Sequence, residues 1–135
     1  MKIKLDPGAY EPTRGHATDA GLDLRTPISF WLYSGEHKKI DTGVHVQIPE
    51  GYVGLITSKS KLMDEGITSR GTIDAGFTGS IKAVMYNHGG EAKLFRAGDK
   101  ITQLVVLPCV IEDIEYVTEL EETERGDGGF GSTGR

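Results

Sequence analysis

The sequence lacks the features that mark membrane or exported proteins. No run of apolar residues reaches the roughly 18 that a membrane-spanning helix needs, and residues 1–5 have no apolar core of signal-peptide length. There is one cysteine, so no disulfide can form within the chain, and in its apolar surroundings we expect Cys109 to be a small buried side chain in a reducing compartment. We therefore expect a cytoplasmic protein without a membrane partner.

An excess of basic residues is also missing. The formal net charge is −5 at pH 7, whereas proteins that bind long nucleic acids neutralise many phosphates with a broad positive field. We therefore expect no nucleic-acid partner. A small anionic ligand stays compatible with this charge, provided that local donors and a metal ion offset the charge of the ligand.

No segment has an apolar pattern of useful helical length, and short strands with turns take its place. Glycine accounts for 19 of 135 residues, about twice its usual share. Residues 44–48 alternate between apolar and polar before the turn Pro49-Glu50-Gly51, which predicts a half-buried strand. The same reasoning predicts strands at residues 53–57, 80–86, 101–107 and 111–117, and a helical turn over residues 60–65. A single all-β domain of the sandwich, jelly-roll or barrel type is expected.

The composition changes abruptly towards the carboxyl end. Residues 112–124 contain seven acidic residues and no basic one, a pattern typical of a strand with a solvated face that runs into a linker. Residues 125–135 then contain five glycines and too little apolar surface to fold alone. We therefore divide the chain into a β domain of residues 1–124 and a carboxyl-terminal arm of residues 125–135.

The arm carries groups that suit a phosphate ligand. Its glycines let backbone N–H groups turn inward, and Arg125, Ser132, Thr133 and Arg135 add cationic and hydroxyl donors. Phe130 is a lone aromatic residue among glycines, and its flat face suits a base or a groove on a partner. A Walker loop is not indicated, because the run ends in arginine with no helix after it.

Three aspartates beside glycines are further candidates: Asp23, Asp74 and Asp99. Each also fits ordinary turn or strand-end chemistry, so these segments alone leave the structural and the functional interpretation open. The four histidines have no spacing typical of a zinc site, and we assign no chemistry to them.

Taken together and in order, five segments resemble the five motifs of the homotrimeric dUTPase family. They cover nearly the whole chain: Ala20-Gly21-Leu22-Asp23-Leu24, Ser58-Lys59-Ser60-Lys61-Leu62, Gly71-Thr72-Ile73-Asp74-Ala75-Gly76-Phe77-Thr78-Gly79, Gly98-Asp99-Lys100-Ile101-Thr102-Gln103-Leu104, and the arm from Arg125 to Gly134. The arm is the most specific, an almost complete Arg-Gly-x-Gly-Gly-Phe-Gly-Ser-Thr-Gly. The resemblance implies a pyrophosphatase that cleaves dUTP to dUMP and pyrophosphate with Mg²⁺.

The resemblance also implies a fold and an assembly. The protomer is expected to be an all-β, jelly-roll-like dUTPase β-barrel with a flexible glycine-rich carboxyl-terminal arm. Three chains are expected around one axis, with three active sites at the chain interfaces and an arm closing over each site.

The resemblance assigns catalytic and phosphate-binding roles. Asp74 is implied to hold and deprotonate the water that attacks the α-phosphorus, a task for a general base. Asp23 is the metal residue, acting through a metal-bound water, and Gln103 acts around the metal and the phosphates. Ser60 is implied to donate to a phosphate oxygen, and Arg125 to meet the terminal phosphate.

Recognition of the base and the sugar is implied in the same way. Backbone groups near Gly71 and Ile73 would read the uracil edge, so that cytosine mismatches donors and acceptors. Phe77 would pack beneath the deoxyribose, and Phe130 would stack on the uracil. The remaining substrate-binding residues of the arm, which excludes water around the triphosphate, are Gly131, Ser132 and Thr133.

Two residues depart from the usual pattern of the family. Lys59 stands where arginine is more common, and lysine keeps the charge but loses the planar fork of a bidentate contact. Phe77 stands where tyrosine is usual, which keeps the ring face and loses only the phenol group.

Two alternatives accompany this hypothesis. The dCTP deaminase family shares the fold, but its proton-shuttling glutamate falls ten residues beyond the aspartate, where this chain has Val84. The other alternative is a regulatory protein that keeps the dUTPase fold and signals to a protein partner through a nucleotide-gated arm.

Overall fold

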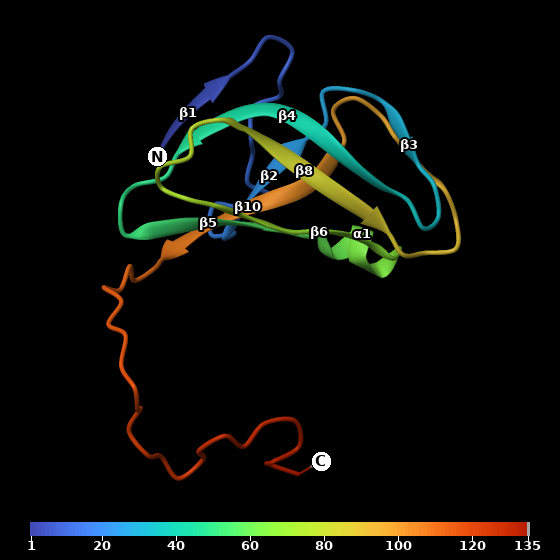
Figure 1. The fold of residues 1–135 in the computed structure, drawn as a ribbon. Coiled ribbons are helices and arrows are strands. Elements are labelled where there is room, and N and C mark those ends of the chain that lie inside the picture. Colours follow the sequence, from blue (N-terminus) through green and yellow to red (C-terminus); the bar gives the residue numbers. More distant parts are fainter. Residues whose placement is uncertain (135) are drawn as a thin grey trace.

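The computed structural model describes residues 1–134, so Arg135, one of the proposed phosphate donors, lies outside the described residues. Residues 1–134 form two four-stranded sheets and one two-stranded sheet, and Figure 1 shows how the elements are arranged. The first sheet has the order β1 (Lys2–Leu5), β4 (His37–Gln47), β8 (Ser80–Asn87), β6 (Ile67–Ser69). The second has the order β2 (Gly21–Arg25), β10 (Lys100–Pro108), β5 (Tyr52–Thr57), β7 (Gly71–Ile73). Strands β3 (Phe30–Leu32) and β9 (Lys93–Phe95) form the third sheet, and α1 (Ser60–Asp64) is a single short helix.

Most of the strand predictions are confirmed. The predicted segments 44–48, 53–57, 80–86 and 101–107 lie in or at the ends of β4, β5, β8 and β10, and α1 occupies the predicted helical turn. The strand pairs are antiparallel, as expected of a chain that alternates short strands with tight turns. The all-β fold class is therefore confirmed.

The predicted strand over residues 111–117 is wrong. After Pro108 the chain forms no strand within the described residues and runs away from the sheets (Figure 1). Apolar side chains in this segment stay in solvent, among them Ile111, Ile114 and Tyr116, which are 84%, 78% and 93% exposed. The physical reason is that a strand needs a neighbour, and no strand of the same chain lies beside this segment.

Cys109 also departs from its expected environment. It is partly exposed rather than buried, because it follows the last residue of β10. Its backbone N–H donates to the carbonyl of Gly51 at 2.9 Å. Among the described residues, this is the last backbone hydrogen bond that connects the chain after β10 to the sheets.

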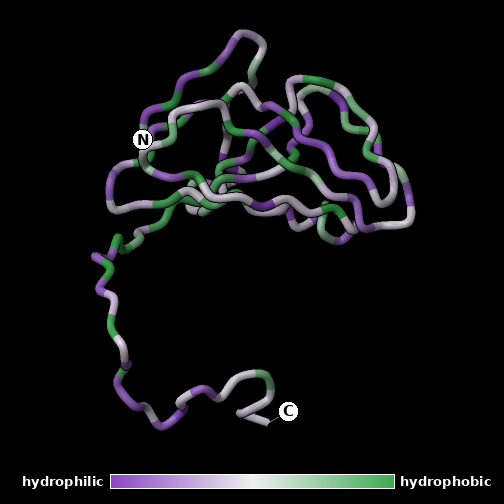
Figure 2. Tube along the Cα trace, in the orientation of Figure 1, coloured by the Kyte–Doolittle hydropathy of each residue, from purple (hydrophilic) through white to green (hydrophobic). Residues whose placement is uncertain are grey.

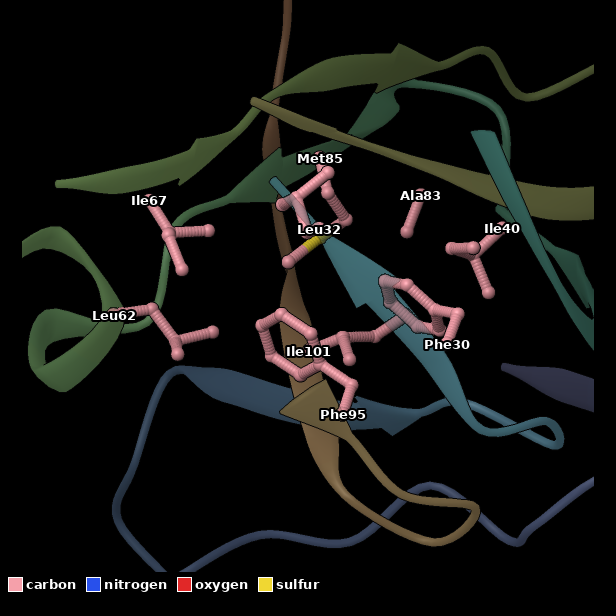
Figure 3. Packing of buried hydrophobic residues seen from close by; sticks show 9 residues of the cluster. All are labelled: Phe30, Leu32, Ile40, Leu62, Ile67, Ala83, Met85, Phe95 and Ile101. Carbon is pink, nitrogen blue, oxygen red and sulfur yellow. The ribbon is translucent and has the colours of Figure 1, made fainter. Parts of the chain in front are cut away.

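The core is formed by two clusters of buried side chains. One cluster joins the two large sheets, with Val44, Val46 and Ile81 from the first sheet facing Leu24 and Leu104 from the second. The other cluster lies beneath the small sheet and α1, where nine residues meet (Figure 3). Within it the rings of Phe30 and Phe95 are stacked with centroids 4.9 Å apart. Figure 2 shows the matching pattern of hydropathy, with apolar stretches in the sheets and a mostly polar carboxyl-terminal segment.

The second sheet has an outer face that the core does not cover. Gly54, Ile56 and Leu104 point into the core, so the side chains between them point outward. Four of these are apolar and only partly buried, and they form two cross-strand pairs, Leu55 with Val105 and Val53 with Leu107. We refer to these four residues as the apolar face.

No helix in residues 1–134 is long and apolar enough to cross a bilayer.

Candidate active site

Asp23 is a buried carboxylate held between two lysines. Its side chain lies on β2 with 3% of the residue exposed. The Nζ atom of Lys100 lies 2.8 Å from Oδ2, and the Nζ atom of Lys59 donates to Oδ1. Burial raises the pKa of Asp23, but the hydrogen bonds and charges of Lys100 and Lys59 outweigh burial and hold this pKa below its ordinary value. Asp23 is therefore an anion at neutral pH.

Gln103 stands beside Asp23 on the same outer face of the second sheet. The two residues are cross-strand partners of β2 and β10, and Gln103 is also opposite Thr57 on β5. The side-chain amide of Gln103 donates to the carbonyl of Ser58 at 3.2 Å. Gly21 of the first motif leaves room for the Gln103 side chain, because a Cβ atom on Gly21 would lie only 2.1 Å from Oε1 of Gln103. The structure thus brings three of the five motifs together at one end of the sheet.

Lys59 and Ser60 lie at the same end. Lys59 precedes α1 and Ser60 is its first residue, exposed to solvent. A groove opens beside them, lined mainly by cations: Arg25, Lys59, Lys61, Lys93 and Lys100. Only Lys59 was identified from the sequence. The other four are missed because the sequence does not show which cations face one groove: Arg25, Lys93 and Lys100 lie on three strands that are distant in sequence, and Lys61 lies in α1.

Asp74 lies in a turn at the other end of the second sheet. It follows β7, and its carbonyl accepts a hydrogen bond from the N–H of Phe77 at 3.0 Å. The turn that its sequence predicts is therefore present. Its side chain is exposed and lines a groove with Tyr52, Val53 and Cys109. Among the described residues no hydrogen bond to the Asp74 carboxylate is found, which leaves its oxygens free to hold a ligand or a water molecule.

The residues expected to read the base and the sugar adjoin Asp74. Ile73 has its side chain in the core, so only its backbone can meet a ligand. Strand β7, which runs from Gly71 to Ile73, is at the edge of its sheet, and an edge strand presents unpaired N–H and C=O groups. Phe77 is 44% exposed, and its ring packs against Gly79, where a Cβ atom would lie 2.7 Å from Cζ of Phe77.

Asp23 and Asp74 are too far apart within one chain to act on one phosphate. Asp23 pairs with Gln103 of β10, which in turn pairs with Thr57 of β5. On the other side of β5, Ile73 of β7 pairs with Gly54. Asp74 is therefore displaced from Asp23 by four residues along the strands, about 13 Å, and by three strand spacings across the sheet, about 14 Å. The separation is roughly 20 Å, and the apolar face lies between the two aspartates. The structure therefore brings the expected site residues together as two groups rather than one.

The arm forms a third group, apart from both. Arg125 and Ser132 make hydrogen bonds only within the arm and its junction among the described residues. Phe130 is fully exposed. Gly131 and Thr133 are exposed as well. Residues 125–134 of the arm therefore make no site with their own β domain.

The donors present suit a magnesium ion only in part. No group of three or more metal-ligating side chains occurs in residues 1–134. Asp23 is one carboxylate with both oxygens engaged by lysines. Magnesium keeps several waters and is coordinated by substrate phosphates rather than by a cage of side chains. Such an ion needs no more than one nearby carboxylate. The chemistry of the site therefore fits an ion carried mainly by phosphates and water.

Comparisons with known proteins show similarity to one enzyme family. The dUTPase family model matches residues 9–134. A deoxyuridine 5'-triphosphate nucleotidohydrolase from Nocardia farcinica is 42% identical over 136 aligned residues, which cover 97% of this chain and 82% of the relative. One from Clostridium kluyveri is also 42% identical and covers 97% of this chain and 94% of the relative.

Solved structures give the same result. The dUTPase of Staphylococcus bacteriophage 80alpha with dUpNHpp is 32% identical and matches with a TM-score of 0.92, covering 99% of this chain and 98% of that chain. A dUTPase mutant from phage phi11 of S. aureus matches with a TM-score of 0.81 at 31% identity, over 90% of this chain and 98% of that chain. That structure is described as revealing how a structural Mg(II) ion is coordinated.

Proposed function

The chain belongs to the dUTPase family, and on this premise we propose that it hydrolyses dUTP to dUMP and pyrophosphate at sites assembled from more than one copy of the chain. The observation that carries this proposal is the separation of Asp23 from Asp74 on one sheet, roughly 20 Å in extent. A triphosphate held near Asp23 cannot reach Asp74 of the same chain at its α-phosphorus. A second chain that places its Asp74 beside the first chain's Asp23 removes this difficulty.

A homotrimer supplies the required neighbours. The apolar face would otherwise stay in water, and burying such surface favours association. The segment after Pro108 supports the same assembly, because its apolar side chains stay largely in solvent, with Val110, Ile111 and Ile114 exposed by 77%, 84% and 78%. Packed on a second chain, this segment would gain the partner strand that it lacks. Fifteen residues lie between Cys109 and Arg125, and the extended chain from one to the other spans up to about 53 Å, enough to bring the arm to a neighbouring site.

Asp74 acts as the general base. A water molecule held by its free carboxylate would lose a proton to it while attacking the α-phosphorus, and pyrophosphate would leave. A carboxylate suits this task because it can accept a proton without changing position. The exposure of Asp74 in a groove, without an intramolecular partner in the described residues, supports the assignment.

Base and sugar recognition belong to the Asp74 group. The free edge of β7 near Gly71 and Ile73 would pair with the uracil edge, where a cytosine would leave donors and acceptors mismatched. Phe77 would pack beneath the deoxyribose, so that a ribose 2'-hydroxyl meets the face of its ring. Phe130 of an arm would stack on the uracil from the other side.

Phosphate binding belongs to the Asp23 group. Ser60, Gln103 and Lys59 would contact the phosphate chain, with the other cations of the groove offsetting its charge. Magnesium, when bound, supplies charge neutralisation on the phosphate oxygens, and Asp23 would hold one of its waters. Arg125 would contact the terminal phosphate as the arm closes, and Gly131, Ser132 and Thr133 would exclude water.

The proposed reaction is tested by pyrophosphate release from dUTP, dCTP, dTTP and UTP, each with and without Mg²⁺. We expect release from dUTP with the metal and little from the other three nucleotides. Deamination of dCTP would instead support the deaminase, but Val84 in place of its glutamate makes this outcome unexpected. Equal release from all four nucleotides would contradict uracil and deoxyribose recognition.

A further inference from the structure

A histidine outside all five motifs holds the loop that carries Asp74 and Phe77. The Nδ1 atom of His45, on β4, lies 2.8 Å from the carbonyl oxygen of Thr78, and its Nε2 atom lies 3.0 Å from Oδ1 of Asp6. The His45 side chain is 20% exposed. One imidazole ring thus joins β4, the residue after β1, and the loop between β7 and β8.

The two partners fix the protonation state that this geometry needs. A backbone carbonyl and an ionised carboxylate both accept hydrogen bonds and neither can donate. A histidine that bonds to both must therefore carry a proton on each nitrogen, which makes it an imidazolium. The neutral ring has one N–H, so it can satisfy either Thr78 or Asp6, and its second nitrogen then faces an acceptor with a lone pair.

The surroundings of His45 favour the imidazolium. The hydrogen bond to the Thr78 carbonyl, then the hydrogen bond and charge of Asp6, raise the pKa of His45 above its ordinary value, against a smaller opposing effect of burial and of Lys4. Asp6 and Lys4 are the charged groups from the β1 segment that face the ring. On β8 the cross-strand partner is the uncharged Ser80. The next charges along these strands, Asp41 and Lys82, pair with each other at 2.6 Å.

The carbonyl that His45 holds is next to the proposed sugar-binding ring. Thr78 directly follows Phe77, whose N–H donates to the carbonyl of Asp74 and whose ring rests on Gly79. The Thr78 carbonyl belongs to the peptide plane between Thr78 and Gly79, so a shift of this carbonyl moves the glycine on which the Phe77 ring rests. Among the described residues, His45 provides the only side-chain hydrogen bond to the backbone of residues 75–79.

We propose that His45, in its doubly protonated form, is a positioning residue of this enzyme, which fixes the Phe77 loop through the Thr78 carbonyl and makes deoxyribose selection depend on pH. This inference rests on the proposed function, because the contact of Phe77 with the sugar belongs to that proposal. We use the word grip for the two hydrogen bonds of His45 to Thr78 and Asp6 together. Both bonds are present below the ordinary histidine pKa of 6.5. The grip is lost as the pH rises through the raised pKa of the folded protein, since the neutral ring keeps only one of the two bonds.

Substitutions of the two residues separate titration from simple contact. In Asp6→Asn the new amide can donate to Nε2 of a neutral ring while Nδ1–H still donates to Thr78, so the grip no longer needs the second proton. His45→Asn places an amide donor near the position of Nδ1 and cannot titrate. His45→Ala removes both bonds. His88→Ala is the matched control, because His88 is an exposed histidine that bonds to Thr68 rather than to the loop.

The experiment measures the ratio of kcat/KM for dUTP to that for UTP from about pH 5.5 to about pH 9, either side of a histidine titration. Both substrates carry the same triphosphate, so its own ionisation cancels in the ratio. In the unmodified enzyme and in His88→Ala we expect the ratio to fall by about twofold to tenfold as the pH rises, the effect of losing one hydrogen bond. In Asp6→Asn and His45→Asn the ratio should stay near its high value, and in His45→Ala it should be low throughout.

A second measurement needs no nucleotide. The N–H of Phe77 donates to Asp74 in the turn, so its hydrogen exchange reports loop opening. The quantity to follow is the exchange rate in the unmodified chain divided by the rate in Asp6→Asn at the same pH. We expect this ratio to rise about twofold to tenfold across the titration of His45.

The outcomes are distinguishable. Exchange that changes as expected in a chain that does not hydrolyse dUTP would support the grip of His45 and overturn the proposed function. Normal dUTP hydrolysis with a flat ratio, or with the same pH dependence in Asp6→Asn, would overturn the role of His45.

Discussion

The Nζ atom of Lys100 lies 2.8 Å from Oδ2 of Asp23, and the opposite oxygen of the same carboxylate accepts from Lys59. One buried anion therefore holds two cations that come from different motifs, one at the start of β10 and one just after β5. A lysine at position 59 reaches the carboxylate with a single Nζ atom. Because this atom is paired with Asp23, Lys59 has fewer N–H donors left for a phosphate, and it lacks the planar fork with which an arginine makes a bidentate contact.

Asp23→Asn is expected to lower the free energy of unfolding by about 1 to 2 kcal/mol at neutral pH. Breaking a fully buried ion pair costs more, but the Lys59 and Lys100 side chains are 27% and 39% exposed and can turn to water. Because the folded pKa of Asp23 is lowered from 3.8, its contribution is present above that value and is lost as the pH falls below it. Urea unfolding at neutral pH and near pH 3 measures both effects. Asp113→Asn, at an exposed position, controls for the change in net charge, and equal stability of Asp23→Asn and the unmodified chain at neutral pH would contradict the ion pairs.

Asp74→Asn should keep the fold and still bind dUTP with Mg²⁺, while turnover falls by about two to four powers of ten. An amide cannot accept the proton of the attacking water. Asp74 makes no side-chain hydrogen bond in the described residues, so the substitution should leave the thermal midpoint nearly unchanged. Single-turnover kinetics and calorimetric binding of dUTP provide the measurements. More than half of normal activity would remove Asp74 from the role of general base.

Phe77→Tyr should be nearly silent, because it restores a phenol group without removing the ring face. Phe77→Ala should let UTP compete, since the ring that meets the 2'-hydroxyl is gone. The ratio of specificity constants for dUTP and UTP measures both. Phe77 is 44% exposed, so the alanine variant should remain folded. An unchanged ratio in that variant would place sugar selection elsewhere.

A mixture of two inactive chains tests the shared site. One chain carries Asp74→Asn with its arm intact, and the other ends at Glu124 with Asp74 intact. If Asp74 and the arm of one site come from different chains, refolding an equal mixture should give activity at about one site in four under random assembly. The comparison is the sum of the two chains refolded separately.

An arm that folds back on its own chain cannot give this rescue, since no site would then hold both parts. The test requires proof that mixed trimers form, for example by native mass spectrometry, because the two chains differ in length. Mixed trimers without any rescue would contradict the shared site.

Local patterns in the sequence were enough to predict the all-β fold, whereas the roles of the motif residues are implied only by the resemblance to the dUTPase family. Alternation identified β5 and β8 because their side chains face the core and the outer surface in turn. The turn at Asp74 follows from Asp-Ala-Gly chemistry, which depends on the residues themselves. The same alternation was wrong for residues 111–117, because a strand also needs a neighbour and the pattern does not say whether one exists.

The tertiary structure alone decided which residues share a site. Asp23 and Lys100 are far apart in sequence and meet because β2 pairs with β10, and strand pairing is a long-range relation that local patterns do not encode. His45 was assigned no chemistry from its spacing, yet the fold places Thr78 and Asp6 at its two nitrogens. The distance between Asp23 and Asp74 is likewise a product of strand order and register, so the division of the site into two groups became visible only when the sheets were assembled.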